Sequence, residues 1–211
     1  MRRFSFFIGT LVFSILTLIA IYFGLPKHDA SEHFDNSRIE SKIMVSGNEI
    51  VYNGDIENGD YIYLSSLIKT HPEVTDIKIQ SRGGIAIEGY AISRLITDNG
   101  LNTETFNNGY CYSACVYVFA GGVQRTTYKN TEFGFHAPGI SSGVDLTSLS
   151  NEQLRSAINI SSIVASEGVI ILIERGVDID LARAVGILTY DDVRYMSGDV
   201  AYRYNLATKL K

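Results

Sequence analysis

A serine and a histidine occupy positions in this sequence where nucleophilic catalysis is chemically feasible. Ser113 lies where the polar stretch "FNNGYCY" gives way to the apolar stretch "ACVYVFAGG", which predicts a hydroxyl at the first position of a buried helix. His136 follows the apolar strand pattern "FGF". A serine hydroxyl is a poor nucleophile until a neighbouring base takes its proton, and histidine is the usual base. The pair therefore predicts acyl transfer, whereas a helix cap and a structural histidine are the alternatives for each residue alone.

The other three histidines are poor candidates for the base. His28 and His33 lie in a polar stretch near the N-terminus, and His71 directly precedes a proline in a loop. Only His136 ends an apolar strand pattern, so it is the base that we pair with Ser113.

Two stretches of backbone could supply the N–H donors that acyl transfer directs at the developing oxyanion. The turn "SRGG" contains Gly83 and Gly84, and without a Cβ their backbone can approach a substrate closely. The junction of Ser113 and Ala114 supplies a second free amide at a helix start, where the helix dipole favours negative charge. An ordinary tight turn is the alternative for "SRGG" considered alone.

Strand and helix patterns alternate along the chain. This alternation predicts an α/β fold with a mainly parallel sheet and crossover helices. Working groups in such folds gather at the carboxyl ends of strands, where residues 83–84, Ser113 and His136 are expected. The expected strands cover residues 47–56, 74–80, 101–106, 125–130 and 131–138, and the expected helices cover residues 58–71, 85–100, 114–120, 150–175, 178–186 and 197–205.

The N-terminus has the pattern of a membrane-spanning helix. Arg2 and Arg3 precede an uncharged, mostly apolar run over residues 4–25. This run reaches the roughly 20 residues that a helix needs to cross a bilayer. The arginines should stay in the cytoplasm, which places the rest of the chain on the far side. We expect an uncleaved signal-anchor, with a cleaved signal peptide as the alternative.

These patterns divide the chain into three parts. Residues 1–25 are the expected signal-anchor or signal peptide, and the polar residues 26–46 are expected to form a linker. Residues 47–211 are long enough for one α/β domain with a substantial core. The domain is expected to be extracytoplasmic, which means periplasmic in a Gram-negative cell, or secreted if the signal is cleaved.

Charge and motif content exclude several classes of protein. The net charge is -5 and no Lys/Arg cluster follows the first three residues, so nucleic acid is not expected as a partner. No Walker-type glycine loop and no GxGxxG motif occur, so no nucleotide cofactor is expected. The two cysteines offer too few nearby ligands for a metal, and no cofactor is expected.

Cys111 and Cys115 lie in what is expected to be a disulfide-permissive compartment. Four residues apart within one regular helix, they would suit a disulfide poorly. A bridge becomes possible if Cys111 lies in the loop before the helix. The alternative is that both are small apolar packing residues, and the sequence leaves this choice open.

Three of these motifs together resemble the Clp peptidase family within the crotonase-like superfamily. Members have an S-P-G-G turn after a strand, a nucleophilic serine at a helix start and a histidine at a strand end. The corresponding residues here are "SRGG" at 81–84, Ser113 in "CYSAC" and His136 in "GFHAP". The resemblance spans roughly residues 47–207.

The resemblance implies a fold and a catalytic set. The fold is an α/β crotonase-like superhelix of repeated β-β-α units with a mainly parallel sheet, here preceded by one N-terminal transmembrane helix. Ser113 is implied as the nucleophile and His136 as the general base. The amides of Gly84 and Ala114 are implied as the oxyanion hole.

The family's acid lies shortly before an element that "YMS" at residues 195–197 matches here. Strict counting lands on Val193, and a shift of one residue places this acid at Asp192. Asp191 is one alternative, and the absence of an acid is the other. An orienting carboxylate holds the tautomer of the imidazole. The resemblance therefore implies a Ser113–His136–Asp192 triad.

The chain departs from the family in three respects. Arg82 replaces the family's proline, and the long helix that builds rings in Clp peptidases is interrupted here by Gly168. An extracytoplasmic domain could not receive substrate from a cytoplasmic ATPase, so ATP-dependent, chambered proteolysis is not implied. Relatives assemble into trimers or rings, which leaves a homo-oligomer as an open alternative.

A serine–lysine pair, which the signal peptide peptidase A group of the superfamily uses, is not expected. No lysine occurs between Lys129 and Lys209. No ammonium therefore lies where a downstream base is expected.

We predict a membrane-anchored extracytoplasmic serine hydrolase, a peptidase that cuts an extended peptide laid beside Gly83, Ile85 and Ala86. Strand addition would bind this peptide or protein substrate mostly through its backbone. The alternative is a catalytically silent relative that binds a peptide or partner through the same groove. A crotonase-type thioester enzyme, from a third class, would share the oxyanion hole without needing Ser113 and His136 together.

Overall fold

Two sheets and the helices beside them make up residues 36–139 and 146–211, the part of the chain that this computed structural model describes. Contacts group Asn36–Lys211 into one unit. The expected signal-anchor at residues 1–25 and the first part of the expected linker lie outside the described residues.

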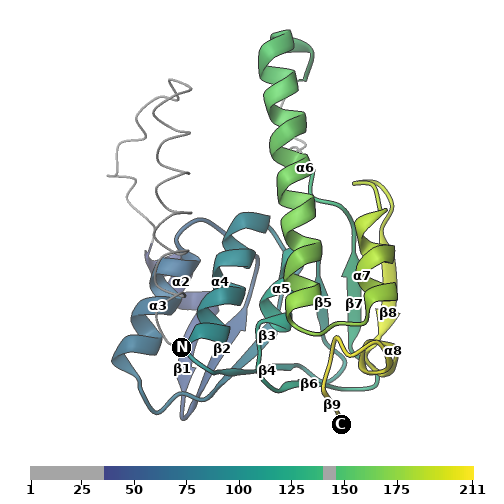
Figure 1. The fold of residues 1–211 in the computed structure, drawn as a ribbon. Coiled ribbons are helices and arrows are strands. Elements are labelled where there is room, and N and C mark those ends of the chain that lie inside the picture. The colour runs from purple at the N-terminus through teal and green to yellow at the C-terminus, as the bar shows by residue number, and fades with distance from the viewer. Residues whose placement is uncertain (1–35, 140–145) are drawn as a thin grey trace, which may run out of the picture. The chain divides into compact units, whose positions relative to one another are not determined.

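The larger sheet has six strands in the order β1-β2-β3-β4-β6-β9 (Figure 1). β1 pairs antiparallel with β2, and each of the other neighbouring pairs is parallel. The expectation of an α/β fold with a mainly parallel sheet is confirmed. The strands are β1 (Ile43–Ser46), β2 (Glu49–Asn53), β3 (Asp76–Gln80), β4 (Asn102–Thr105), β6 (Arg125–Thr127) and β9 (Lys209–Leu210).

A second sheet of three strands carries the residues of the candidate site. Its order is β5 (Tyr110–Tyr112), β7 (Glu132–Phe135) and β8 (Arg194–Ser197). β5 and β7 are parallel, whereas β8 is antiparallel to β7. The sequence patterns did not predict β5 and β8, because each is short and lacks a clear alternation.

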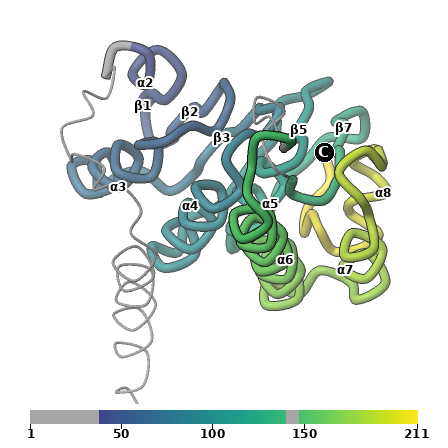
Figure 2. The backbone as a smooth tube through the Cα atoms, turned by 90° about the horizontal axis from the view of Figure 1, so that it is seen from above, coloured from purple at the N-terminus to yellow at the C-terminus, as the bar shows by residue number. Residues whose placement is uncertain are grey.

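The helices follow the expected positions closely. In Figure 2, α3, α4, α6 and α7 lie along one side of the strands. Neighbouring helices pack in the order α3, α4, α5, α6 and α7. Their bounds, with the shorter elements, are α2 (Asn36–Lys42), α3 (Asp60–Thr70), α4 (Ala86–Asp98), α5 (Ala114–Ala120), the 3-10 helix η1 (Leu146–Ser148), α6 (Asn151–Glu174), α7 (Ile179–Gly186) and α8 (Gly198–Arg203).

The core lies between the larger sheet and these helices. The alternation in β2 and β3 buries Ile50, Tyr52, Ile77 and Ile79 completely. Every residue of α5 is buried, which confirms the prediction of a buried helix directly after Ser113. Burying one large apolar side chain contributes about 1.5–3 kcal/mol, so this helix is firmly held.

Residues 36–46, which were expected to belong to a linker, form α2 and β1 instead. Ile39 and Ile43 are buried, and β1 pairs with β2 along its whole length. The apolar spacing there is too short to give a recognisable period. The segment becomes a strand only because β2 accepts its backbone hydrogen bonds.

A buried ion cluster connects α2 to the loop before α3. The Lys42 ammonium donates to the carbonyl of Asp55 at 2.7 Å and to Glu57 and Asp60 carboxylates at 2.9 Å. The Tyr52 hydroxyl also donates to Asp60, which is fully buried. Burial and this carboxylate raise the pKa of Tyr52 far above its ordinary value, so the phenol remains a donor.

The ion cluster positions a segment that contacts the glycine turn. The Ile56 amide donates to the carbonyl of Gly83 at 2.7 Å, and the Ile85 amide donates to the carbonyl of Ile56 at 2.9 Å. The loop held by Lys42 is therefore the backbone partner of the "SRGG" turn.

Lys42→Met should lower the free energy of unfolding by about 3–5 kcal/mol, because it leaves the Asp60 carboxylate buried without its cation. Urea unfolding measures this loss. Arg38→Met is the matched control, since Arg38 reaches Glu57 from an exposed position and should cost less than about 1 kcal/mol. Equal losses in the two variants would contradict a buried role for Lys42.

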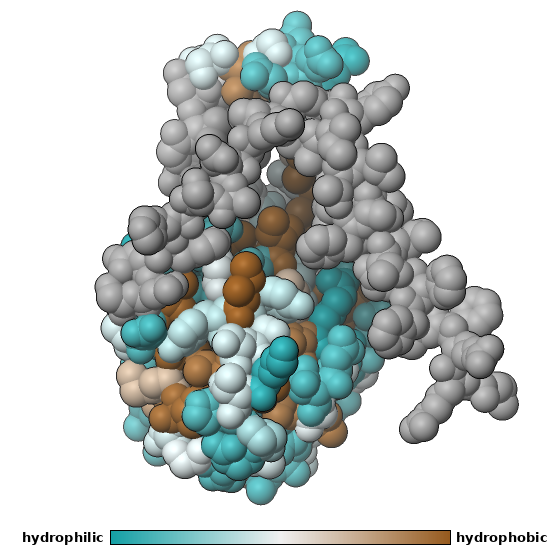
Figure 3. All heavy atoms as spheres, turned by 90° about the vertical axis from the view of Figure 1, so that its left-hand side faces the viewer, coloured by the Kyte–Doolittle hydropathy of each residue, from teal (hydrophilic) through white to brown (hydrophobic). Residues whose placement is uncertain are grey.

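Helix α6 is the one described helix with the length and apolar composition to cross a membrane. A capping box of Ser150 and Gln153 begins it. Gly168, Ile171 and Leu172 are buried near its C-terminal end, whereas its N-terminal part extends beyond the sheets (Figure 1). On the face in Figure 3, apolar and polar side chains are interspersed and the far end of α6 is largely polar. Packing against α5 and α7 accounts for part of the apolar character of α6.

Candidate active site

Ser113 occupies a sharp turn between β5 and α5. Its backbone has φ 52° and ψ -123°, a region that costs a non-glycine residue about 1–3 kcal/mol. A strained strand-to-helix turn of this kind is the geometry that exposes a nucleophilic serine in other hydrolase folds. The side chain does not cap α5, and it makes no hydrogen bond within the described part of the chain. The structure therefore disfavours the helix-cap alternative.

The pairing of β5 with β7 brings Ser113 to the strand end that carries His136. Tyr112 pairs with Gly134, and the Ser113 amide donates to the carbonyl of Gly134 at 2.8 Å. Continuing this register places Ser113 opposite Phe135, so His136 is the next residue along the adjacent strand. Ser113 and His136 are both partly exposed, which leaves them accessible to a substrate.

The glycine turn lies directly against Ser113. A Cβ added at Gly83 would lie 2.6 Å from the Ser113 Cβ and 3.0 Å from the Ala114 nitrogen. Gly83 also has φ 100°, which side-chain-bearing residues rarely adopt. Ser81 holds the turn in place, because its carbonyl accepts from the Tyr112 amide and its hydroxyl accepts from the Gly83 amide. Only glycine allows this close approach.

The amides of Gly84 and Ala114, predicted as the oxyanion hole, donate no hydrogen bond within the described residues. Ala114 is the first residue of α5, where the amide has no intrahelical acceptor. Gly84 has φ 137°, and a Cβ there would lie 2.1 Å from the Ile56 carbonyl oxygen. Both amides are therefore free to bind a developing negative charge.

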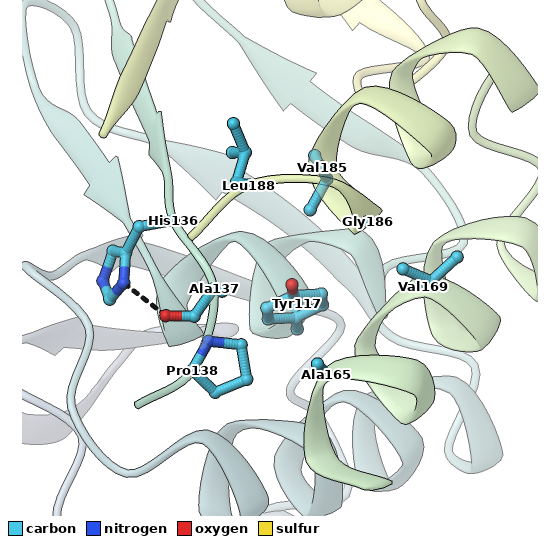
Figure 4. Close-up of a pocket in the computed structure, with 9 residues that line it drawn as sticks. All are labelled: Tyr117, His136, Ala137, Pro138, Ala165, Val169, Val185, Gly186 and Leu188. Carbon is cyan, nitrogen blue, oxygen red and sulfur yellow. Dashed lines mark hydrogen bonds between the residues drawn. The ribbon is translucent and has the colours of Figure 1, made fainter. Parts of the chain in front are cut away.

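The His136 imidazole is oriented by its own neighbour in the chain. Its Nδ1 lies 2.8 Å from the carbonyl oxygen of Ala137 (Figure 4). A carbonyl oxygen only accepts, so Nδ1 carries the proton and Nε2 is left as the basic nitrogen. The Tyr190 ring packs edge-on against the imidazole, with ring centroids 5.4 Å apart. This tautomer is the one that a general base for Ser113 requires.

The structure does not bring the Asp192 carboxylate to the imidazole. Asp192 is exposed and accepts from the Thr189 hydroxyl at 3.1 Å, and Asp191 is likewise exposed. The carbonyl of Thr189 accepts from the Ala137 amide at 3.2 Å. The acidic segment therefore passes close to His136, but its backbone makes the contact.

Sequence reasoning missed two groups that contact His136, the Ala137 carbonyl and the Tyr190 ring. A backbone carbonyl leaves no trace in a residue pattern. Tyr190 directly precedes the two acidic residues, and no local signal distinguishes it from a surface tyrosine.

The predicted groove is shorter than expected. Ile85 is extended, with φ -71° and ψ 111°, but Ala86 is the first residue of α4. The extended backbone beside the turn therefore ends at Ile85, and Ala86 cannot contribute strand-like hydrogen bonds. The Ile85 amide is also already used by Ile56.

An apolar pocket adjoins His136. It lies between the end of β7, α5, α6 and the end of α7 (Figure 4). Apart from the imidazole and one phenol, its lining is aliphatic, and its volume of about 20 Å³ leaves room for little more than a water molecule. The lining residues are Tyr117, His136, Ala137, Pro138, Ala165, Val169, Val185, Gly186 and Leu188.

Cys111 and Cys115 form a disulfide across the Ser113 turn. Cys111 belongs to β5 rather than to the helix, which meets the condition under which a bridge was possible. Both residues are fully buried. The choice that the sequence left open is therefore resolved in favour of the bridge.

Comparison with known proteins places the architecture. No protein-family model matches the chain, and no curated protein matches it. Among solved structures, a variant of ClpP1 from Listeria monocytogenes superposes with a TM-score of 0.56 over 83% of this chain and 94% of that chain. The fold is ClpP-like. At 16% sequence identity, the likeness to ClpP1 shows the fold alone, and the chemistry has to be argued from the residues of this chain.

Gly83→Ala should destabilise the protein, because the new methyl group would overlap the Ser113 Cβ. Gly47→Ala is the matched control, since Gly47 also has positive φ but nothing lies within 4 Å of an added Cβ. The control should cost only about 1 kcal/mol of backbone strain, and Gly83→Ala at least about 1–3 kcal/mol more. Urea unfolding of both variants tests this, and equal losses would place the turn away from Ser113.

Proposed function

We propose that this protein with a ClpP-like fold is a serine hydrolase that cleaves extended peptides, with Ser113 as nucleophile and His136 as general base. One observation carries the proposal. The Ser113 hydroxyl is unbonded within the described residues, on a strained turn beside the strand end that carries His136. A structural serine has no need of such a backbone conformation.

The proposed reaction assigns one step to each of these groups. The Ser113 oxygen attacks the carbonyl carbon of the peptide while the His136 Nε2 takes the hydroxyl proton. The negative charge on the carbonyl oxygen is stabilised by the amides of Gly84 and Ala114. The imidazolium then gives the proton to the leaving amine, which leaves Ser113 acylated. In the second stage, His136 takes a proton from water, the water oxygen attacks the acyl carbon, and the proton returns to the Ser113 oxygen as the acid product leaves.

The substrate class is supported by the surroundings of Ser113. An extended peptide can lie beside the glycine turn, where the Gly84 amide is free within the described part of the chain. This stretch presents few side chains and therefore tolerates many sequences. Arg82 is exposed at the turn, where its guanidinium is available to an acidic side chain of the substrate.

An extracytoplasmic location, with attachment through residues 4–25, belongs to the same proposal. The Cys111–Cys115 disulfide supports it, because disulfides persist in oxidising compartments and are rare in the cytosol.

A catalytically silent peptide-binding module is the second candidate. The absence of a described contact between His136 and Asp192 favours this candidate. In a catalytic triad, the carboxylate normally stabilises the positive charge of the imidazolium. The groove beside the glycine turn would then bind a peptide without cleaving it.

A fluorophosphonate probe should label the folded protein at Ser113, and both Ser113→Ala and His136→Ala should abolish the label. Mass spectrometry of the labelled peptide measures this. Ser162→Ala, at an exposed position, and His71→Ala, at a partly exposed one, are the matched controls away from the turn and should leave labelling unchanged. A folded protein that no serine-directed probe labels would favour the binding module.

Asp192→Asn should change the labelling rate less than about threefold, because the Ala137 carbonyl already sets the tautomer of His136. Labelling reactions quenched at successive times give the rate constant for each protein. A loss on the order of 10⁴-fold, which an orienting aspartate typically produces, would show that the acidic segment closes on His136 during reaction.

A further inference from the structure

We infer that the Cys111–Cys115 disulfide is a positioning element that holds Ser113 in its reactive backbone conformation, an inference that rests on the proposed function. The bridge joins the strand before the turn to the first turn of the helix after it. It encloses Tyr112, Ser113 and Ala114. Two of these three residues supply the nucleophile and an oxyanion amide.

The Ser113 conformation needs support from outside the residue. A sparsely populated φ/ψ region persists only where the surrounding structure over-determines it. The Ser113 side chain makes no hydrogen bond among the described residues, so only the backbone contacts hold it. These are two hydrogen bonds. The Ser113 amide donates to the Gly134 carbonyl at 2.8 Å, and the Val116 amide donates to the Ser113 carbonyl at 3.0 Å.

The two cysteines of the bridge differ in how firmly other segments hold them. Cys111 pairs with Phe133 of β7 and also forms an isolated bridge with Ser81 of the glycine turn. It is therefore the residue where the β5 strand meets both the strand carrying His136 and the turn carrying Gly83. Cys115 lies in the first turn of α5, a seven-residue helix, which is too short to be stable alone. The disulfide thus ties the start of a short helix to a point fixed by two other segments.

A purely stabilising role fits this bridge poorly. Chain-entropy stabilisation by a disulfide grows with the length of the loop that it closes. Cys111 and Cys115 are only four positions apart, so the bridge restricts the unfolded chain less than a bridge that closes a long loop. What it restricts strongly is the local geometry of the three enclosed residues.

The experiment compares one sequence in two covalent states. The full-length chain is prepared as the disulfide and, by folding under reducing conditions, as the dithiol, because both cysteines are fully buried and a reductant would not reach them in the folded protein. Fluorophosphonate labelling at increasing probe concentration separates the maximal rate constant from probe affinity. The labelled fraction at completion reports how much protein is folded and competent.

We expect a maximal rate constant 10- to 100-fold lower in the dithiol, since small misplacements of a reacting group have effects of this order. Probe affinity and the final labelled fraction should stay unchanged. Unfolding the dithiol and refolding it with oxidised glutathione should restore the rate, with the two thiols giving up two electrons and two protons as one oxidised glutathione becomes two reduced molecules. A merely structural role would instead lower the labelled fraction and leave the rate constant unaltered.

Two variants guard against a folding artefact. Cys111→Ala/Cys115→Ala should reproduce the slow labelling of the dithiol and should not recover on oxidation. Leu64→Ala, a buried change in α3, should lower the melting temperature without lowering the rate constant.

The outcomes separate the two proposals. A disulfide form that is folded yet unlabelled overturns the proposed function and this inference with it. A folded dithiol labelled as fast as the disulfide overturns the inference alone. If neither the dithiol nor the double-alanine protein folds, the bridge is a requirement of folding and the positioning role is overturned.

Discussion

The parallel pairing of β5 with β7 is the constraint on which the candidate site depends. It places the end of one short strand, where Ser113 begins the turn into α5, beside the end of another, which His136 follows. The bond from the Ser113 amide to Gly134 fixes this meeting at the level of single residues. A slip of one residue in this register would turn the side chains of the slipped strand to the other face of the sheet.

A series of contacts connects Ser113 to the glycine turn, to Ile56 and to the Lys42 cluster. The glycine turn lies against Ser113, Ile56 pairs with the other side of the turn, and the Lys42 cluster holds the loop that contains Ile56. The glycine contacts leave no room for an added Cβ atom, and the buried Asp60 carboxylate needs the Lys42 ammonium. Groups that are distant in the sequence thereby share one rigid environment, which is what preorganised catalysis needs.

The orientation of His136 shows how a local contact can replace a distant one. The Ala137 carbonyl sets the tautomer that the sequence-based interpretation assigned to Asp192, while Asp192 itself bonds to Thr189. A neutral carbonyl fixes the proton on Nδ1 but stabilises an imidazolium less than a carboxylate would. A hydrolase built this way would be slower than one with a complete triad.

Much of this molecule could be predicted because periodicity is a property of consecutive residues. The alternation in residues 76–80, the helical stripe in residues 86–98 and the change from polar to apolar at Ser113 each follow from local sequence, and the structure has elements at those places. The strand role of residues 43–46, the Cys111–Cys115 bridge, the neighbours of His136 and the contact of Asp192 with Thr189 could not be predicted in this way. Each depends on which distant segment packs alongside, and only the tertiary structure, which sets strand register and loop path, decides that.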